Sequence, residues 1–121
     1  MTDDQIILDA IDKFLDKEVK PVARDLELAD AYPYEIVEKM KVLGLFGATI
    51  GTQYGGMGLS AATYAQIVER VSAVWMSVCG IFNSHLIMCA APERFGTEAL
   101  KEQFLRRMAA GDLPGGIALI E

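Results

Sequence analysis

The stretch QYGGMGLSA, residues 53–61, decides between two fold classes. Residues 56–61 follow the pattern G-x-G-x-x-A and lead into a segment of helical period. In an α/β protein such a loop joins a buried strand to a helix and holds a dinucleotide pyrophosphate on backbone N–H groups. That site also needs an acidic residue about twenty positions further on. No Asp or Glu stands between Glu69 and Glu93, so the sequence favours glycines that turn the chain before a helix capped by Ser60.

Apolar residues recur at helical spacing along nearly the whole chain, with charged residues between them. The sequence therefore predicts an all-α fold, an up-and-down helical domain of about five helices. Pro21 is expected to bend or restart the first helix, and Gly44 and Gly111 to end the second and the fifth. The expected helices cover residues 6–29, 33–43, 60–73, 77–90 and 97–110.

The last residues have a different composition. After Pro114-Gly115-Gly116, the run IALIE has the β-branched and apolar make-up of a strand. A single short strand without a partner strand is not stable, so it either adds to another chain's sheet or marks a domain boundary at which the sequence was cut. We therefore expect a helical domain over residues 1–116 and the start of a truncated β-domain over residues 117–121.

Charge and cysteine content exclude several classes of protein. The chain has 17 acidic and 11 basic residues, and Arg106-Arg107 is its only basic cluster, which argues against nucleic acid as a partner. Cys79 and Cys89 are ten residues apart in an expected helix, about 15 Å along its axis, too far for a disulfide. We expect reduced, buried thiols in a cytoplasmic protein, without a targeting segment at the acidic N-terminus.

Hydrophobicity is high and unevenly distributed. Apolar residues make up 52% of the chain, and residues 71–92 include no Lys, Arg, Asp or Glu, a run long enough to cross a bilayer. Asn83, Ser84 and His85 lie in the middle of this run and point about 100° apart on a helix, so they cannot share one face. We therefore predict no membrane span. The helix should instead be covered by protein, including neighbours outside this sequence, and the protein is expected to be a homo-oligomer.

Residues typical of catalysis are scarce. His85 is the single histidine, and no acidic residue lies within two helical turns to orient it, so a hydrogen-bonded core histidine is favoured over a catalytic one. The serines lack a G-x-S-x-G setting, and the two cysteines lack a C-x-x-C spacing. The sequence predicts neither a catalytic residue nor a metal site in this chain.

Five short motifs nevertheless stand in a characteristic order. They are Pro33 in a Pro-x-Glu helix start, Gly44-Leu45-Phe46-Gly47, Tyr54-Gly55-Gly56-Met57-Gly58-Leu59, Phe95-Gly96-Thr97-Glu98 with Lys101 and Phe104-Leu105, and Ala118-Leu119-Ile120-Glu121. In this order they resemble the N-terminal domain of acyl-CoA dehydrogenases. Two departures occur: Gly51-Thr52-Gln53 stands where Pro-Glu-Glu is common in that family, and Ile120 stands where threonine is usual.

This resemblance implies a flavin-dependent reaction. In the family, FAD accepts hydride from the β-carbon of an acyl-CoA thioester while a carboxylate removes the α-proton, and an electron-transfer acceptor reoxidises the flavin. The β-domain and C-terminal helices, which hold FAD and the carboxylate, are absent from this sequence. The chain alone is therefore expected to bind no FAD and to catalyse nothing.

The resemblance also assigns candidate site residues. Ile117, Leu119 and Ile120 match strand positions that touch the flavin ring. Cys79, Asn83 and Ile87 share one helix face at i, i+4 and i+8, and the matching helix in the family lines the acyl chain. The alternative is that this face is ordinary core.

Two functions thus remain open. One is a partial acyl-CoA dehydrogenase, completed by a longer polypeptide. The other is a non-catalytic helical subunit that binds a partner chain through its apolar face.

Overall fold

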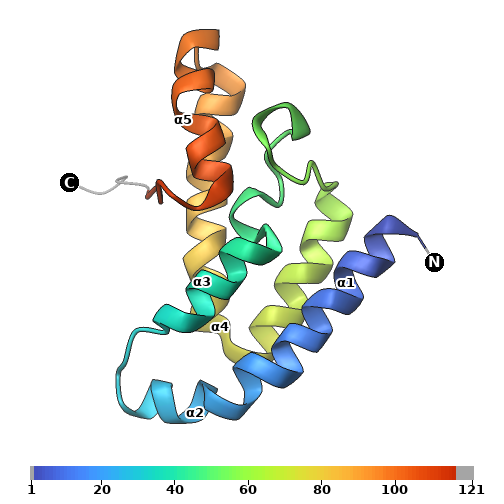
Figure 1. The fold of residues 1–121 in the computed structure, drawn as a ribbon, viewed down its shortest axis with the longest axis vertical. Helices are drawn as coiled ribbons and strands as arrows, with labels where there is room; N and C mark the ends of the chain where they lie inside the picture. Colours follow the sequence, from blue (N-terminus) through green and yellow to red (C-terminus); the bar gives the residue numbers. More distant parts are fainter. Residues whose placement is uncertain (1, 117–121) are drawn as a thin grey trace.

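The computed structural model describes residues 2–116 of the chain, and helices dominate them (Figure 1). No β-strand occurs within this range, so the prediction of an all-α fold is confirmed. The strand predicted at residues 117–121 lies outside the described residues. The elements are α1 (Asp3–Phe14), a π-helical turn η1 (Leu15–Val19), α2 (Lys20–Leu28), α3 (Tyr34–Leu43), the 3-10 turns η2 (Leu45–Gly47) and η3 (Thr52–Tyr54), α4 (Ala61–Phe95) and α5 (Glu98–Ala110).

The first predicted helix is bent near Pro21, as expected, and the bend has a definite form. α1 passes into α2 through the π-helical turn, and the N–H of Lys20 donates to the carbonyl of Leu15. A proline ring has no N–H and would clash with the carbonyl four residues earlier in a regular helix, so a widened turn relieves the conflict. Figure 1 shows the chain changing direction between α1 and α2.

α4 combines the third and fourth predicted helices. Its backbone leaves the helical region at Trp75, where φ is −160° and ψ is 100°, and this break lies in the gap predicted between the two helices. The second half continues to Phe95, so the predicted end at Ala90 was placed too early. Pro92 removes one helical hydrogen bond, but the N–H of Gly96 closes the last turn on the carbonyl of Pro92 at 2.9 Å. The helix therefore tolerates this proline.

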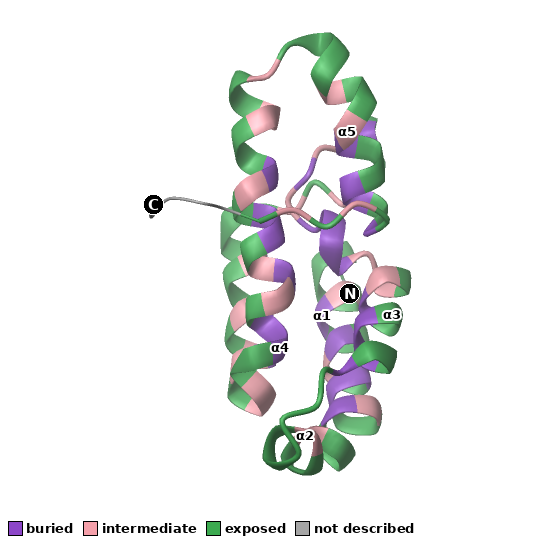
Figure 2. Ribbon diagram, turned by 90° about the vertical axis from the view of Figure 1, so that its left-hand side faces the viewer, coloured by how far each residue is buried: buried purple, intermediate pink, exposed green. Residues whose placement is uncertain are grey.

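The core lies between α4 and the elements that pack on one side of it. Figure 2 shows buried residues on the side of α4 that faces α1 and α3, and exposed residues on the opposite side. Full burial of a large apolar side chain contributes roughly 1.5–3 kcal/mol to the stability of the fold. The largest apolar side chains with less than 2% exposure are Ile11, Met40, Leu45, Ile50, Ile67, Phe82 and Leu105.

Three large apolar side chains in the second half of α4 are exposed. Met76, Ile87 and Phe95 have 74%, 53% and 86% of their surface accessible. Isolated apolar residues on a surface are ordinary, but here three large ones occur along one helix that carries few charges.

The glycine-rich segment before α4 folds back on η2. The N–H groups of Met57, Gly58 and Leu59 donate to the carbonyls of Gly47, Ile50 and Ala48 at 2.8, 2.9 and 2.9 Å. A Cβ atom at Gly56 would stand 2.1 Å from the carbonyl oxygen of Ile50. Glycine is therefore required at position 56 by the close approach of two backbone segments.

We predict opposite effects for alanine at two glycines. Gly56→Ala should lower the free energy of unfolding by about 1–3 kcal/mol or more, because the backbone at Ile50 cannot move aside as a side chain can. Gly80→Ala, in α4, is the control, because nothing lies within 4 Å of the added Cβ and alanine favours the helix by about 0.5–1 kcal/mol. Urea unfolding followed by circular dichroism measures both. Equal stabilities of the two variants would contradict the packing role of Gly56.

Candidate functional site

The three predicted acyl-facing residues lie in the half of α4 that follows the break at Trp75, and their burial decreases along the helix. Cys79 is buried at 5% exposure, Asn83 is half-buried, and Ile87 is 53% exposed. The structure therefore places them on a face that leaves the core and reaches the surface. This face is neither wholly core nor wholly solvated.

Asn83 has a specific partner in the first half of α4. The Tyr64 hydroxyl donates to Asn83 Oδ1 at 2.6 Å, and the Tyr64 ring packs edge-on against Phe82 with centroids 6.4 Å apart. Burial, and secondly Cys79, raise the pKa of Tyr64, so the phenol remains a protonated donor at neutral pH. Tyr64 could not be predicted from the sequence, because a tyrosine at helical spacing gives no signal that its hydroxyl meets an amide nineteen residues away.

Both cysteines are free and buried, as predicted. Burial, and secondly the charge of Glu93, raise the pKa of the Cys89 thiol to about 11. The group is therefore a neutral thiol at physiological pH, and a thiol is a poor nucleophile compared with a thiolate.

His85 is a core residue, and the prediction of a hydrogen-bonded core histidine is confirmed. Its side chain is 1% exposed. Nε2 lies 2.8 Å from the carbonyl oxygen of Met108 in α5, and Nδ1 accepts the N–H of Gly115 at 3.0 Å. The Phe46 ring meets the imidazole edge-on at 5.1 Å. Desolvation lowers the pKa of His85 below its ordinary value, although the backbone hydrogen bonds act in the opposite direction.

The predicted flavin contacts Ile117, Leu119 and Ile120 lie outside the described residues. The described chain leads towards them through Gly115 and Gly116, past α4. A Cβ atom at Gly115 would stand 1.7 Å from Cε of Met88, so the backbone at Gly115 lies directly against that side chain.

The glycine motif at residues 56–61 does not present free amides at its glycine turn. The N–H of Gly56 donates to Gly51 at 3.2 Å, and the next three N–H groups donate to carbonyls of residues 47–50. Ser60 then caps α4 by accepting from the N–H of Thr63 at 3.3 Å. A phosphate cradle needs such groups to point outward at the ligand. The motif is a turn that is satisfied internally.

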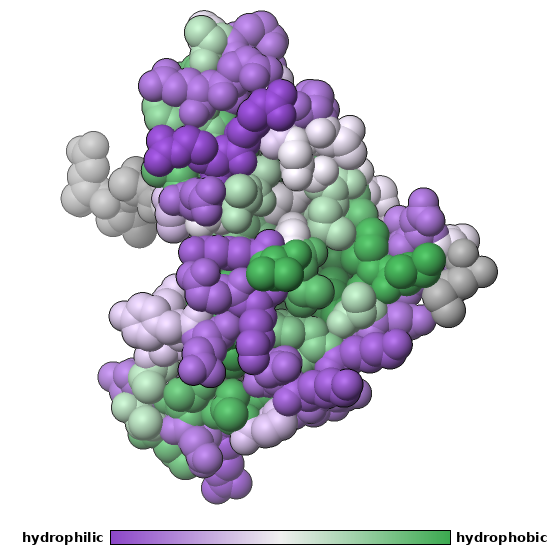
Figure 3. All heavy atoms as spheres, in the orientation of Figure 1, coloured by the Kyte–Doolittle hydropathy of each residue, from purple (hydrophilic) through white to green (hydrophobic). Residues whose placement is uncertain are grey.

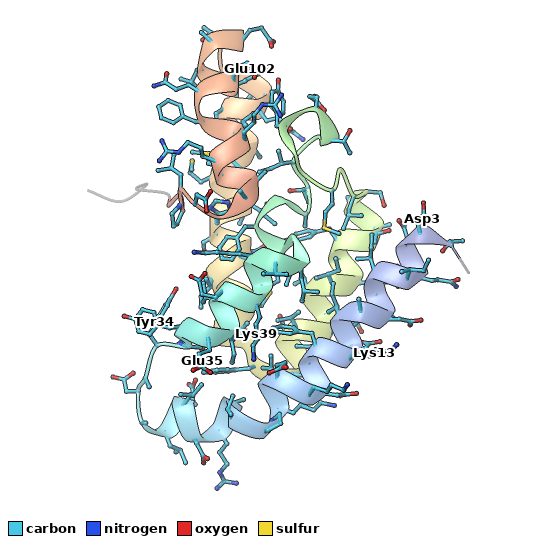
Figure 4. All side chains as sticks on the ribbon, viewed as in Figure 1. Asp3, Lys13, Tyr34, Glu35, Lys39 and Glu102 are labelled. Atoms are coloured by element: carbon cyan, nitrogen blue, oxygen red, sulfur yellow. The ribbon has the colours of Figure 1, made fainter. Side chains whose placement is uncertain are left out.

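A hollow lies between α2 and α3, and none of the predicted site residues within the described range lines it. It is an open groove of about 480 Å³ whose lining includes Val22, Leu26 and Ile36. Figure 3 shows apolar surface between charged side chains at this place, and Figure 4 shows Tyr34, Glu35 and Lys39 of α3 along its edge. Lys39 is already paired with Glu18 at 2.5 Å. The groove therefore has apolar walls and mixed charges at its rim, without the convergent polar groups of a catalytic site.

α4 is long and apolar enough to cross a membrane by length and composition, with a mean hydropathy of 1.5 in its most apolar window. A core helix passes the same test. The break at Trp75 divides the helix, and Asn83 and His85 both have protein partners. These contacts are those of a helix that packs against protein.

Comparison with protein families matches residues 1–112 to the N-terminal domain of acyl-CoA dehydrogenases. The short-chain-specific acyl-CoA dehydrogenase of Clostridium acetobutylicum is 30% identical over 118 residues, covering 97% of this chain and 31% of the relative. The 3-(aryl)acrylate reductase of Clostridium sporogenes is 33% identical, covering 89% of this chain and 29% of the relative.

Two solved structures share the fold. Butyryl-CoA dehydrogenase from Megasphaera elsdenii matches with a TM-score of 0.82 at 28% identity, over 94% of this chain and 31% of that one. A chain from a structure of the electron transferring flavoprotein of Acidaminococcus fermentans also gives 0.82, at 31% identity, over 92% of this chain and 30% of that one. The chain thus spans less than a third of the length of these proteins.

His85 leads to a prediction of pH-dependent stability. The unfolded ring gains a proton as the pH falls through about 6.5, whereas the folded ring resists protonation because its pKa is lowered. The unfolded state then binds more protons than the folded state. The contribution of His85 to the free energy of unfolding is therefore fully present above about pH 6.5 and decreases below it, by at most about 1.4 kcal/mol per pH unit.

His85→Asn provides the control, because asparagine does not titrate in this range. Denaturant unfolding of the wild type and of His85→Asn between about pH 7.5 and 5 separates the effect of imidazole titration on stability from the effect of carboxylate titration. The same pH dependence in both proteins would refute this role of His85.

Proposed function

Because the chain belongs to the acyl-CoA dehydrogenase family through its N-terminal domain, we propose that it is the N-terminal helical domain of a flavin-dependent acyl-CoA dehydrogenase. The family match over residues 1–112 carries this proposal. The exposed apolar side chains in the second half of α4 support it, because a domain that packs against the rest of a longer polypeptide needs such a surface.

In this proposal the complete enzyme oxidises an acyl-CoA thioester between its α- and β-carbons. FAD, when bound, accepts the hydride from the β-carbon. The backbone N–H groups of Met57, Gly58 and Leu59 are bonded within their own loop, so the motif at residues 56–61 does not cradle the pyrophosphate. This domain would meet only the edge of the flavin ring, through Ile117, Leu119 and Ile120. Isoleucine at position 120 would contact it by packing or by its backbone, since it has no hydroxyl.

The acyl chain would lie along Cys79, Asn83 and Ile87. The gradient from buried Cys79 to exposed Ile87 suits a wall that is completed by other parts of the enzyme. Asn83 would place one polar group in that wall, held by the Tyr64 hydroxyl.

The partners of the complete enzyme follow from the same proposal. They are an acyl-CoA substrate and an electron-transfer acceptor, and the structural similarity to a chain from an electron transferring flavoprotein structure supports the second. We further propose a cytoplasmic homo-oligomer without a membrane span. The alternative remains a non-catalytic subunit that binds a partner chain through α4.

Expression of the complete reading frame that contains this chain tests the proposed function. The purified protein should be yellow, and an acyl-CoA should bleach the flavin absorption under anaerobic conditions. The 121-residue chain alone should be colourless, because a few apolar contacts worth about 1–2 kcal/mol each cannot offset the roughly 4–15 kcal/mol lost on binding.

A reading frame that ends at Glu121, with a colourless product that retains a partner chain, would favour the helical subunit instead. A yellow preparation of the short chain that keeps its flavin through gel filtration would contradict the assignment of the cofactor to the rest of the enzyme.

Asn83→Leu in the complete enzyme tests the acyl wall. It should change the preference among acyl-CoA lengths by roughly 1–3 kcal/mol in kcat/KM, since a pocket wall discriminates by about this amount for each misfitted group. Tyr64→Phe is the matched control, because it removes the hydroxyl that holds Asn83 but leaves the amide in the wall. Stability should fall by about 1–3 kcal/mol in either variant.

If the face is ordinary core, both variants lower the melting temperature and leave the chain-length profile unchanged. That result would reject the proposal that Cys79, Asn83 and Ile87 line the acyl chain.

A further inference from the structure

His85 stands where three parts of the chain meet. The residue belongs to α4, its Nε2 faces the Met108 carbonyl of α5, and its Nδ1 faces the N–H of Gly115 in the segment that follows α5. The Met108 carbonyl can only accept, so Nε2 carries the proton and donates it. The Gly115 amide can only donate, so its bond to the ring requires an unprotonated Nδ1. These two bonds together correspond to one neutral tautomer, although the backbone carbonyl of Phe46 also acts on the ring as an acceptor and raises its pKa.

Leu113 packs against the core, and the backbone of residues 112–115 is hydrogen-bonded at two points. At its start, the N–H groups of Asp112 and Leu113 donate to the Arg107 carbonyl at 3.0 and 3.3 Å. Pro114 has no N–H to donate. The next attachment is the bond from Gly115 to His85, 30 residues away in sequence.

Gly115 also fits its place sterically. Its Cα lies so close to Met88 that a Cβ atom would stand 1.7 Å from the Met88 Cε. His85 and Met88 are one helical turn apart on α4, so one stretch of that helix both bonds and packs against Gly115.

We propose that His85 is a positioning residue that fixes the path by which the chain leaves the helical domain. The imidazole holds Gly115 against α4 and so fixes the backbone at the end of the described residues. Under the proposed function, on which this last step rests, His85 acts on the chain just before the residues proposed to contact the flavin, without touching the flavin.

Two substitutions separate the two bonds of the ring. In His85→Asn the side-chain oxygen takes the place of Nδ1 and can still accept from Gly115, but the donor to Met108 is lost. In His85→Gln the amide reaches the place of Nε2 and can still donate to Met108, but the acceptor for Gly115 is lost.

Hydrogen exchange of the Gly115 amide, followed by NMR in the 121-residue chain, measures the difference. Exchange in His85→Gln should be about tenfold or more faster than in His85→Asn, relative to the amides of α5 as internal reference. A purely structural role would affect both variants through global unfolding and leave their ratio near one. That ratio would overturn the proposal.

The pH provides a second measurement that needs no variant. Protonation of Nδ1 removes the acceptor, so Gly115 exchange in the wild-type chain, corrected for its intrinsic pH dependence, should accelerate with acid. His85→Asn should not show this acceleration. Cys89, whose Sγ lies 3.6 Å from Nε2, is the titratable neighbour on α4 and stays a neutral thiol. The charge of Glu93, about two turns beyond His85 on α4, acts on Cys89. The contacts from η2, α5 and the following segment are the ring and backbone of Phe46, the Met108 carbonyl and the Gly115 amide, none of which titrates.

The tautomer itself can be observed if neither variant folds. Long-range ¹H–¹⁵N spectra of the wild-type imidazole at neutral pH should show a protonated Nε2 and an unprotonated Nδ1. A protonated Nδ1 would refute the proposal. Because none of these measurements requires flavin, a failure here is distinct from a failure of the complete reading frame to yield a flavoprotein.

Discussion

The fold depends on the burial of one side of α4. Val71, Val78 and Phe82 have at most 1% of their surface exposed, and they occur on both sides of the break at Trp75. A helix with so few charges gains stability in water only where other elements cover it, and α1, η1, α2, η2 and α5 contact it. The break is part of this constraint, because it gives the two halves different directions and lets each bury its own stripe.

Local sequence signals accounted for most of the fold. Helical period, Pro21, and the glycines at positions 44 and 111 located the elements, since each acts within a few residues. The predicted helix end at Ala90 was too early, because α4 continues through Pro92 to Phe95. The N–H of Gly51 bonds to Glu93 at 2.9 Å, and this contact across 42 residues holds the last turns of α4 to the loop. Contacts over such separations leave no local pattern.

The candidate site was predictable in its position on the helix but not in its surroundings. The spacing of Cys79, Asn83 and Ile87 placed them on one face, because helical geometry alone determines that result. Their graded burial depends on where the other elements end. The bond from Tyr64 to Asn83 depends on the fold of α4 around its break. Both required the three-dimensional structure.

The residue at the break in α4 is also an intrinsic fluorescent probe. Trp75 is the single tryptophan of the chain, and its indole N–H donates to Glu27 of α2 at 2.5 Å. Indole emission responds to its immediate surroundings, whereas circular dichroism sums over all helices. The intrinsic tryptophan fluorescence of this protein therefore reports on one contact, the packing of α2 against the middle of α4. Detachment of α2 would change the emission while most of the helical circular dichroism signal remained.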